Sequence, residues 1–430
     1  MMKFLRNPKR LLCLQSGTHY WTFIWFLTVL IGGHLSCPAR LIAQDPLDGA
    51  PNELQINTDD PEEVKKRTPE YQSALDAMRA HVFKMREIIV RHSVSMTAEE
   101  DQKLRRDFSN AQMEGHRLFD TMIDAALAQF LADPENNSAT EQMLYEVVKD
   151  SVEMDRFENM LPVAQALINR NFDGEKLKAY MALSAIAMNQ WELAKPFVSH
   201  LSELGISESY LHQLNDELEG LKEKWQKELS EREKDAAGEP LPQAIIRTTK
   251  GDVLVELFEN NAPGTVGTFI SLAEQGFYDN LEFHRVLQHF MAQTGCPIGD
   301  GTGGPGFYIY SEASRPDARP FFRGTLGIAI ASDPNTGLPL VHSGGSQFFV
   351  TYVPTFELEG TYTSFGRVLT GMEVVASLTR VNPDEKPAEG EPPVIPDRVL
   401  NIEIVRKRDH EYVPNKLQTP QESGIPAGTK

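Results

Sequence analysis

The spacing of apolar residues changes near residue 244, and this change constrains the fold more than any other feature of the chain. Through residues 71–89 and 118–130, apolar residues recur three and four positions apart, which is typical of amphipathic helices. From residue 245 to residue 257 they follow the alternating pattern of strands instead. Residues 235–242, with two prolines and a glycine, separate the two regions. We therefore predict a multidomain protein, with an all-α part followed by a mainly β part.

Composition and apolar spacing together divide the chain into six segments. The stretch after residue 44 is rich in Asp, Pro, Asn and Glu and poor in large apolar residues, which is typical of a disordered linker. We expect a signal peptide at 1–43, a linker at 44–70, a helical domain at 71–234, a second linker at 235–242, a β-rich domain at 243–409 and a disordered tail at 410–430.

The N-terminal residues have the pattern of an export signal. Four basic residues precede an apolar run from Tyr20 to Ile31, and this run is shorter than the roughly 20 residues that a membrane-spanning helix needs. Cleavage after Ala43 is expected, which would make the protein periplasmic or secreted. Two alternatives remain open: a retained segment that anchors the chain in a membrane, and a lipid attached to Cys37.

The charge of the chain excludes one class of partner. The formal net charge is -19, and residues 45–242 alone carry 22 Lys and Arg against 39 Asp and Glu. Proteins that bind nucleic acid need clustered cations for the phosphates, so no nucleic-acid partner is expected. After cleavage near residue 43 only Cys296 would remain, so no disulfide is expected, and no zinc or EF-hand spacing predicts a metal or cofactor.

A weak internal repeat runs through residues 143–204. Three pairs of similar residues lie 34 positions apart: Phe157 and Trp191, Pro162 and Pro196, and Leu167 and Leu201. A helical repeat of this length is similar to the tetratricopeptide repeat, although two units are fewer than a self-supporting stack requires. An unrelated helical bundle is the alternative. The charged residues 211–233 are expected to form a connector helix, in preference to a dimerising coiled coil.

The β-rich domain is expected to contain short strands and two helices. Residues 245–257 predict a hairpin around Lys250-Gly251-Asp252. Helices are expected at Pro263–Glu274 and Glu373–Leu378. Further strands are expected at Glu282–Val286, Phe290–Gln293, Thr325–Ala331, Gln347–Tyr352, Thr363–Val368 and Val399–Arg406.

The motif Phe-His-Arg-Val at 283–286 places one permanent cation among apolar rings. It is followed by Phe-Met-Ala-Gln at 290–293 and by Ser-Gln-Phe-Phe-Val at 346–350. Arginine has a pKa above roughly 12 and cannot act as a general base, and glutamine does not titrate. The cluster therefore lacks the groups of a hydrolase and suits a reaction that breaks no covalent bond.

These motifs, together with the glycine-rich loop at 299–306, resemble the signature of the cyclophilin-type peptidyl-prolyl cis-trans isomerases. The resemblance covers residues 243–409, about two-fifths of the chain. It implies a closed antiparallel eight-stranded β-barrel with two capping helices, and the isomerisation of X-Pro bonds without a cofactor. The implied partners are proline-containing peptides and unfolded protein clients, with room for a protein partner on the helical domain.

The resemblance also implies roles for individual residues. Arg285 would donate to the prolyl nitrogen of the twisted amide, and Gln293 would hold the substrate backbone and steady the guanidinium. His284 is expected to be a packed barrel residue and not a base. The remaining substrate-binding residues would be Phe290, Met291, Ala329, Ile330, Gln347, Phe349, Leu358 and Tyr362.

The sequence departs from the family pattern at several positions. Ile330 stands where the family usually has Asn, Glu357 where many members have Trp, and Tyr362 where they have His, and residues 333–345 lengthen a loop. None of these changes removes Arg285. A non-catalytic module that binds proline-containing segments is the alternative function, but such a module would not need the arginine.

Overall fold

The computed structural model describes residues 61–94, 97–206, 208–385 and 393–417. The expected signal peptide and most of the first expected linker lie outside the described residues. The chain divides into two compact units, one of residues 1–147 and 169–172, the other of residues 148–168 and 173–430. The division falls within a helix near residue 147, while the boundary expected from composition is at 235–242.

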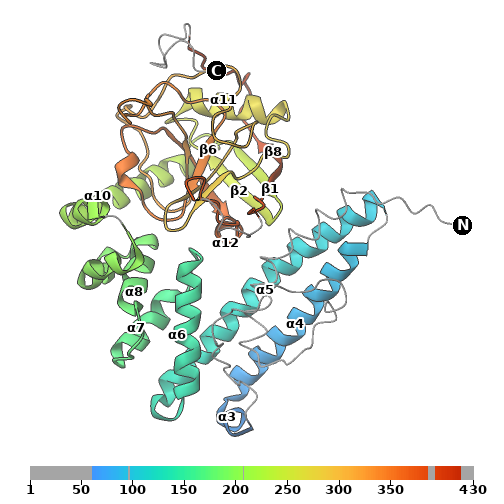
Figure 1. Cartoon of the computed structure of the whole chain (residues 1–430), viewed down its shortest axis with the longest axis vertical. Coiled ribbons are helices and arrows are strands. Elements are labelled where there is room, and N and C mark those ends of the chain that lie inside the picture. Colours follow the sequence, from blue (N-terminus) through green and yellow to red (C-terminus); the bar gives the residue numbers. More distant parts are fainter. Residues whose placement is uncertain (1–60, 95–96, 207, 386–392, 418–430) are drawn as a thin grey trace, which may run out of the picture. The chain divides into compact units, whose positions relative to one another are not determined.

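The first unit is helical in its described part. Its long helices α4 and α5 lie side by side as an antiparallel hairpin (Figure 1). Thr97 caps α5 by accepting a hydrogen bond from the Glu100 N–H at 3.1 Å. Among the described residues, no helix is long and apolar enough to cross a membrane. The helices are α3 (Pro61–Lys66), α4 (Pro69–Val94), α5 (Ala98–Ala132), η3 (Pro134–Asn136) and α6 (Ser138–Glu153), whose last turns belong to the second unit.

The second unit begins with helices that repeat at the spacing seen in the sequence. Asp155 follows α6 with φ 59°, and Asn189 follows α8 with φ 58°, 34 residues later. Gly205 of this unit has φ 73°, and Asn171, 34 residues earlier and counted with the first unit, has φ 56°. Residues after α6 and α8 close each helix with equivalent backbone hydrogen bonds, from Arg156 to Ser151 and from Gln190 to Ala185. The elements are α7 (Met160–Asn169), α8 (Leu177–Ala187), α9 (Trp191–Ala194), η4 (Lys195–Leu204) and α10 (Glu208–Ala237).

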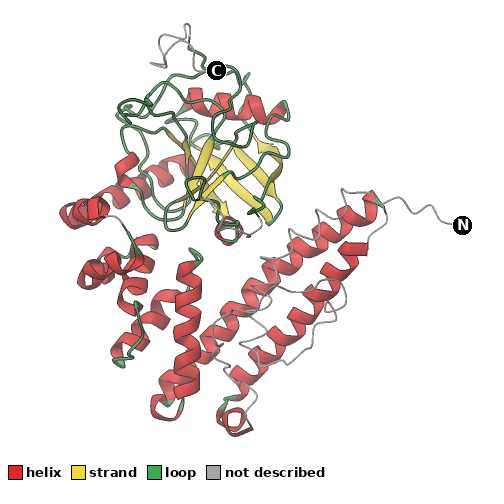
Figure 2. Cartoon of the chain, viewed as in Figure 1, coloured by secondary structure: helices red, strands yellow, loops and turns green. Residues whose placement is uncertain are grey.

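The remainder of the second unit is a curled antiparallel sheet of eight strands (Figure 2). Its order is β3-β4-β6-β5-β7-β2-β1-β8. A bridge between Glu282 and Arg398 joins its two ends and closes the barrel, which confirms the expected fold. The strands are β1 (Gln243–Thr248), β2 (Gly251–Leu257), β3 (Arg285–Leu287), β4 (Met291–Thr294), β5 (Thr325–Ile328), β6 (Phe348–Thr351), β7 (Ser364–Thr370) and β8 (Val399–Arg406).

Two helices, α11 (Pro263–Glu274) and α12 (Met372–Ala376), accompany the barrel. The ring of Phe269 on α11 lies with its centroid 5.4 Å from those of Tyr278, Phe348 and Phe365, so α11 packs directly into the barrel core. Tyr412 also packs on the barrel and donates a hydrogen bond to Glu259 at 2.9 Å. The barrel domain therefore continues beyond its expected end at residue 409. The first eight residues of the expected tail, 410–417, are described in the structure.

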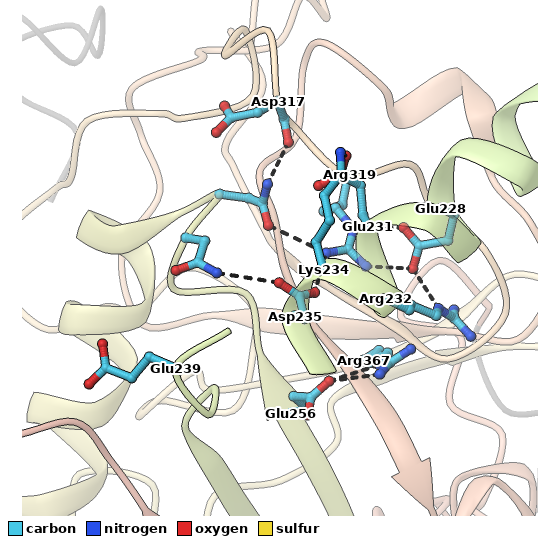
Figure 3. A network of polar contacts seen from close by, with 12 residues as sticks. Glu228, Glu231, Arg232, Lys234, Asp235, Glu239, Glu256, Asp317, Arg319 and Arg367 are labelled. Carbon is cyan, nitrogen blue, oxygen red and sulfur yellow. Dashed lines mark hydrogen bonds and ion pairs between the residues drawn. The ribbon is translucent and has the colours of Figure 1, made fainter. Parts of the chain in front are cut away.

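Helix α10 is joined to the barrel by a buried ion-pair network (Figure 3). Arg319, in the loop before β5, donates to both Glu228 oxygens at 2.6 and 2.8 Å, and to Asp235 at 2.7 Å. The side chains of Arg319 and Glu228 are only 1% and 3% exposed. Burial raises the pKa of Glu228, but the hydrogen bonds and positive charges of Arg319 and Arg232 together outweigh it and hold that pKa below its usual value. The carboxylate therefore stays charged, and α10 belongs to the same compact unit as the barrel.

Candidate active site

Arg285 on β3 lies directly opposite Gln293 on β4. The two residues are partners in the antiparallel register, so their side chains project from the same face of the sheet. The Arg285 guanidinium lies over the ring of Phe290, 5.7 Å from its centroid. Within the described part of the chain, no carboxylate lies within 4.0 Å of this guanidinium. Its donors therefore remain available to a substrate.

The surroundings of Arg285 leave it a cation. Partial burial lowers the pKa of Arg285 from its ordinary value, while Asp384 and the Tyr362 hydroxyl act in the opposite direction. An arginine whose pKa starts this high stays protonated at neutral pH. The site thus holds a partly desolvated cation, which interacts with a substrate dipole more strongly than a fully hydrated one would.

A chain of amide groups links Gln293 to the glycine-rich loop. Gln347 donates from Nε2 to the carbonyl oxygens of Gly301 at 2.7 Å and Gly303 at 2.8 Å. These two acceptors orient the Gln347 amide, so its oxygen faces Gln293 and accepts from Gln293 Nε2 at 2.8 Å. Among the described residues, nothing donates to the Gln293 oxygen. That oxygen can accept from a peptide N–H or from Arg285.

The apolar residues expected to bind proline gather in one cluster. Met291, Phe349 and Leu358 are buried together, and Leu287, Phe290, Ala329 and Tyr362 pack around them. Leu358 comes from the short helix η5 (Phe356–Leu358). We call this group, together with Phe321, the proline socket, after the role that the sequence predicts for it. Ile330 is not part of the cluster; it is half-buried and lies close to Gly344.

Phe321 is a socket residue that the sequence patterns do not predict. It is 1% exposed, and its ring stacks on that of Phe349. A Cβ on Gly327 would lie 2.3 Å from the Phe349 ring and 2.7 Å from the Phe321 ring, so only glycine fits between them. Phe321 lies in a loop without periodicity. The pair of adjacent phenylalanines, Phe321 and Phe322, is the one signal that could have indicated a buried loop.

We call the helices of the second unit that precede the barrel, within residues 148–237, the helical segment, and two of its tryptophans pack behind the socket. The Trp225 ring meets the Phe322 ring edge-on, with their centroids 4.8 Å apart. The centroids of the Trp191 and Phe356 rings are 6.4 Å apart. Phe322 and Phe356 meet edge-on at 5.7 Å. Because Phe322 follows Phe321 and Phe356 begins the η5 turn that carries Leu358, these contacts support two walls of the socket.

His284, the neighbour of Arg285, is buried in the barrel. Burial lowers its pKa below 6.5, so the imidazole is neutral at physiological pH. A Cβ on Gly301 would lie 3.6 Å from the ring, so the glycine loop lies against it. These surroundings agree with the expectation that His284 has a packing role.

Comparison with known proteins follows the same part of the chain. Residues 244–404 match the family described as cyclophilin type peptidyl-prolyl cis-trans isomerase/CLD. A peptidyl-prolyl cis-trans isomerase of Synechococcus elongatus is 39% identical over 167 residues, which are 38% of this chain and 97% of that protein. One from Helicobacter pylori is 42% identical over 138 residues, 32% of this chain and 78% of that protein. A crystal structure of a cyclophilin type isomerase from Cryptosporidium parvum aligns with a TM-score of 0.33 at 29% identity, over 39% of this chain and 99% of that one.

Proposed function

We propose a role in the folding of exported proteins for this chain, which belongs to the cyclophilin-type peptidyl-prolyl cis-trans isomerase family. Its enzymatic activity is peptidyl-prolyl cis-trans isomerisation (EC 5.2.1.8), and its substrates are proline-containing peptides. The observation that carries the assignment of the catalytic group is Arg285, a half-buried cation beside an apolar socket, without a carboxylate partner in the described structure.

Arg285 acts on the one bond that the reaction must loosen. The X-Pro amide resists rotation, with a barrier near 20 kcal/mol, because the nitrogen lone pair is shared with the carbonyl. When the amide twists, that lone pair localises on nitrogen and becomes a better hydrogen-bond acceptor. A guanidinium N–H aimed at this nitrogen therefore stabilises the twisted state more than the planar one, which lowers the barrier.

The other site residues hold the peptide in place for this step. The proline ring enters the socket formed by Phe290, Met291, Phe349 and Leu358, with Tyr362 at its edge. The free Gln293 oxygen accepts a backbone N–H of the peptide, Gln347 fixes Gln293, and the backbone at Ala329 and Ile330 borders the peptide. The apolar walls exclude water and strengthen the hydrogen bonds of Arg285.

The helical part would bring large clients to the barrel. The matching turns at Asp155 and Asn189 support tetratricopeptide-like helical pairs within residues 143–204. The acidic residues 45–242 would attract basic or unfolded chains and raise their concentration near the socket. We place the mature protein in the periplasm or outside the cell, attached to a membrane only if its N-terminal segment is retained.

Two experiments test this function. Exchange NMR on a short X-Pro peptide measures the isomerase rate of the full chain, and a protein that binds the peptide without accelerating exchange would be a binding module instead. Cell fractionation, with N-terminal sequencing of the purified protein, tests export. A cytoplasmic protein that keeps residues 1–43 would contradict the proposed location.

A further inference from the structure

The turn between β3 and β4 connects the two parts of the active site. It runs from Leu287 to Phe290, with Arg285 two residues before it and Met291 directly after it. His289 within this turn has φ 56°, a left-handed conformation that is unfavourable for most residues with a side chain. Such a conformation persists when surrounding contacts hold it.

Those contacts come from the helical segment. Asp155, which follows α6 and is fully buried, accepts hydrogen bonds from the His289 backbone N–H at 3.0 Å and from His289 Nδ1 at 2.8 Å. Gln288 adds a second link by donating to the carbonyl oxygen of Glu153 at 2.7 Å. One side chain and one backbone carbonyl of the α6 terminus therefore hold consecutive residues of the turn.

The same carboxylate also holds the segment on the other side of β3. Arg380 donates to Asp155 at 2.6 Å and to the Tyr352 hydroxyl at 3.0 Å. The next residue, Val381, exchanges two backbone hydrogen bonds with Val286, at 2.8 and 3.0 Å. Asp155 thus contacts both the turn that follows β3 and the segment at Arg380 that pairs with β3.

The β3–β4 turn fixes the position of Phe290. This residue follows His289 directly, its carbonyl oxygen accepts from the Tyr352 N–H at 2.8 Å, and its ring lies under the Arg285 guanidinium. A displacement of His289 would therefore move the ring that supports the catalytic cation. It would also move Met291, one residue further along, in the socket.

We propose that Asp155 is a positioning residue of the isomerase site: by holding His289 and Arg380, it fixes the β3–β4 turn and through it Arg285 and Phe290. The helical segment is then part of the machinery that sets the catalytic rate. This inference rests on the proposed role of Arg285.

The substitution Asp155→Asn in the full chain tests the proposal. Asparagine tolerates the left-handed backbone and keeps one acceptor oxygen, but it loses the charge and the second acceptor. We expect kcat on a short X-Pro peptide to fall by about tenfold with a smaller change in KM, because the interaction of Arg285 with the twisted amide forms only in the transition state. Asp173→Asn, the same change at an exposed position of the helical segment, should leave both parameters unchanged.

His289→Gly gives a second route to the same contact. Glycine adopts the positive φ readily and keeps the backbone N–H but removes Nδ1. If Asp155 acts through His289, the losses of the two single variants should not add in the double variant Asp155→Asn/His289→Gly. Additive losses would overturn the proposed route.

The controls separate this inference from the proposed function. All variants are assayed well below their thermal midpoints, and Arg285→Ala is included. If Arg285→Ala is inactive while a folded Asp155→Asn has full kcat, the positioning role is wrong and the function stands. If Arg285→Ala keeps full activity, the proposed catalytic role itself fails. Should Asp155→Asn not fold, an unchanged kcat in both folded His289→Gly and folded Arg380→Gln would still reject the proposal.

Discussion

The ring of Phe321 stacks on the ring of Phe349, with centroids 5.9 Å apart and planes inclined by 20°. Phe349 lines the proline socket from β6, and Phe321 supports it from a loop. Behind Phe321, its neighbour Phe322 contacts Trp225 of α10. The wall of the socket is therefore continuous with the packing of the helical segment.

This stacking leads to a prediction for Phe321→Ala. Truncating a buried phenylalanine removes apolar contacts and leaves a cavity, at a typical cost of about 3–5 kcal/mol in free energy of unfolding. We expect a loss of this size in urea unfolding, and a raised KM for X-Pro peptides because Phe349 loses its support. Phe307, half-buried on the barrel, gives a control: Phe307→Ala should destabilise the fold less and leave KM unchanged. An unchanged KM in Phe321→Ala would show that Phe349 keeps its position without the stack.

Arg285→Ala tests the catalytic assignment. If the Arg285 guanidinium donates to the prolyl nitrogen as proposed, its removal is expected to lower kcat/KM by at least about 10²-fold, equivalent to about 2.7 kcal/mol of transition-state stabilisation. Stability should change little, since within the described structure Arg285 forms no ion pair. Arg315→Ala, which breaks an exposed pair with Asp317, serves as the control and should be fully active. A variant at Arg285 with more than half of the normal activity would refute the assignment.

The pH dependence of kcat/KM should be flat from about pH 6.5 to 9. Burial lowers the pKa of Arg285 from its ordinary value, but the group remains protonated in this range. Burial also lowers the pKa of His284 below 6.5, so this group is neutral above that value and gains a proton only in more acidic solution. A proton there would repel Arg285, so any loss of activity is expected on the acidic side. A bell-shaped profile centred between pH 7 and 8 would show that a general base takes part.

The residues of the candidate site that the sequence predicted and that the structure brings together lie mainly on regular strands. Met291 and Phe349 belong to strands whose alternation and motifs were readable, and the structure brings them together in the socket. Phe321 was missed because a loop has no period to reveal which side chains are buried. Its position depends on the space that Gly327 leaves and on the ring of Phe349, which lies 28 residues further along the chain.

The contacts between the helical segment and the barrel were also invisible in the sequence. Asp155 and His289 are 134 residues apart, and the 34-residue repeat that contains Asp155 indicates a turn after a helix but no contact with the barrel. The proline-rich residues 235–242 indicated a linker by composition alone. Amino-acid composition indicates local backbone preferences. The ion pair of Arg319 with Glu228 joins residues on either side of that linker and depends on the tertiary fold, so composition could not predict it.

Glu228→Gln should reveal how strongly α10 is held on the barrel. Removing one partner of a buried ion pair leaves an uncompensated charge and typically costs about 3–5 kcal/mol. We expect the free energy of unfolding, measured in urea, to fall by an amount at the lower end of this range, because Asp235 still accepts a hydrogen bond from Arg319. Glu231→Gln on the same helix alters a surface pair with Lys234 and should cost less than about 1 kcal/mol. Equal stabilities of the two variants would show that the buried pair contributes no more than a surface one.

Truncated chains test where the isomerase part begins. The sequence places its start at residue 243, whereas the compact unit in the structure also includes the helices that precede it. A chain of residues 243–417 loses Asp155 and Glu228, so the buried Arg319 is left without its Glu228 partner. It also loses both tryptophans that cover Phe322 and Phe356, which exposes an apolar surface. A chain of residues 138–417 keeps all of these contacts. We expect the longer chain to match the full protein in its urea midpoint and in kcat/KM, and the shorter one to unfold at lower urea and to isomerise X-Pro peptides more slowly. A shorter chain with the midpoint and activity of the full protein would instead place the domain boundary at residues 235–242.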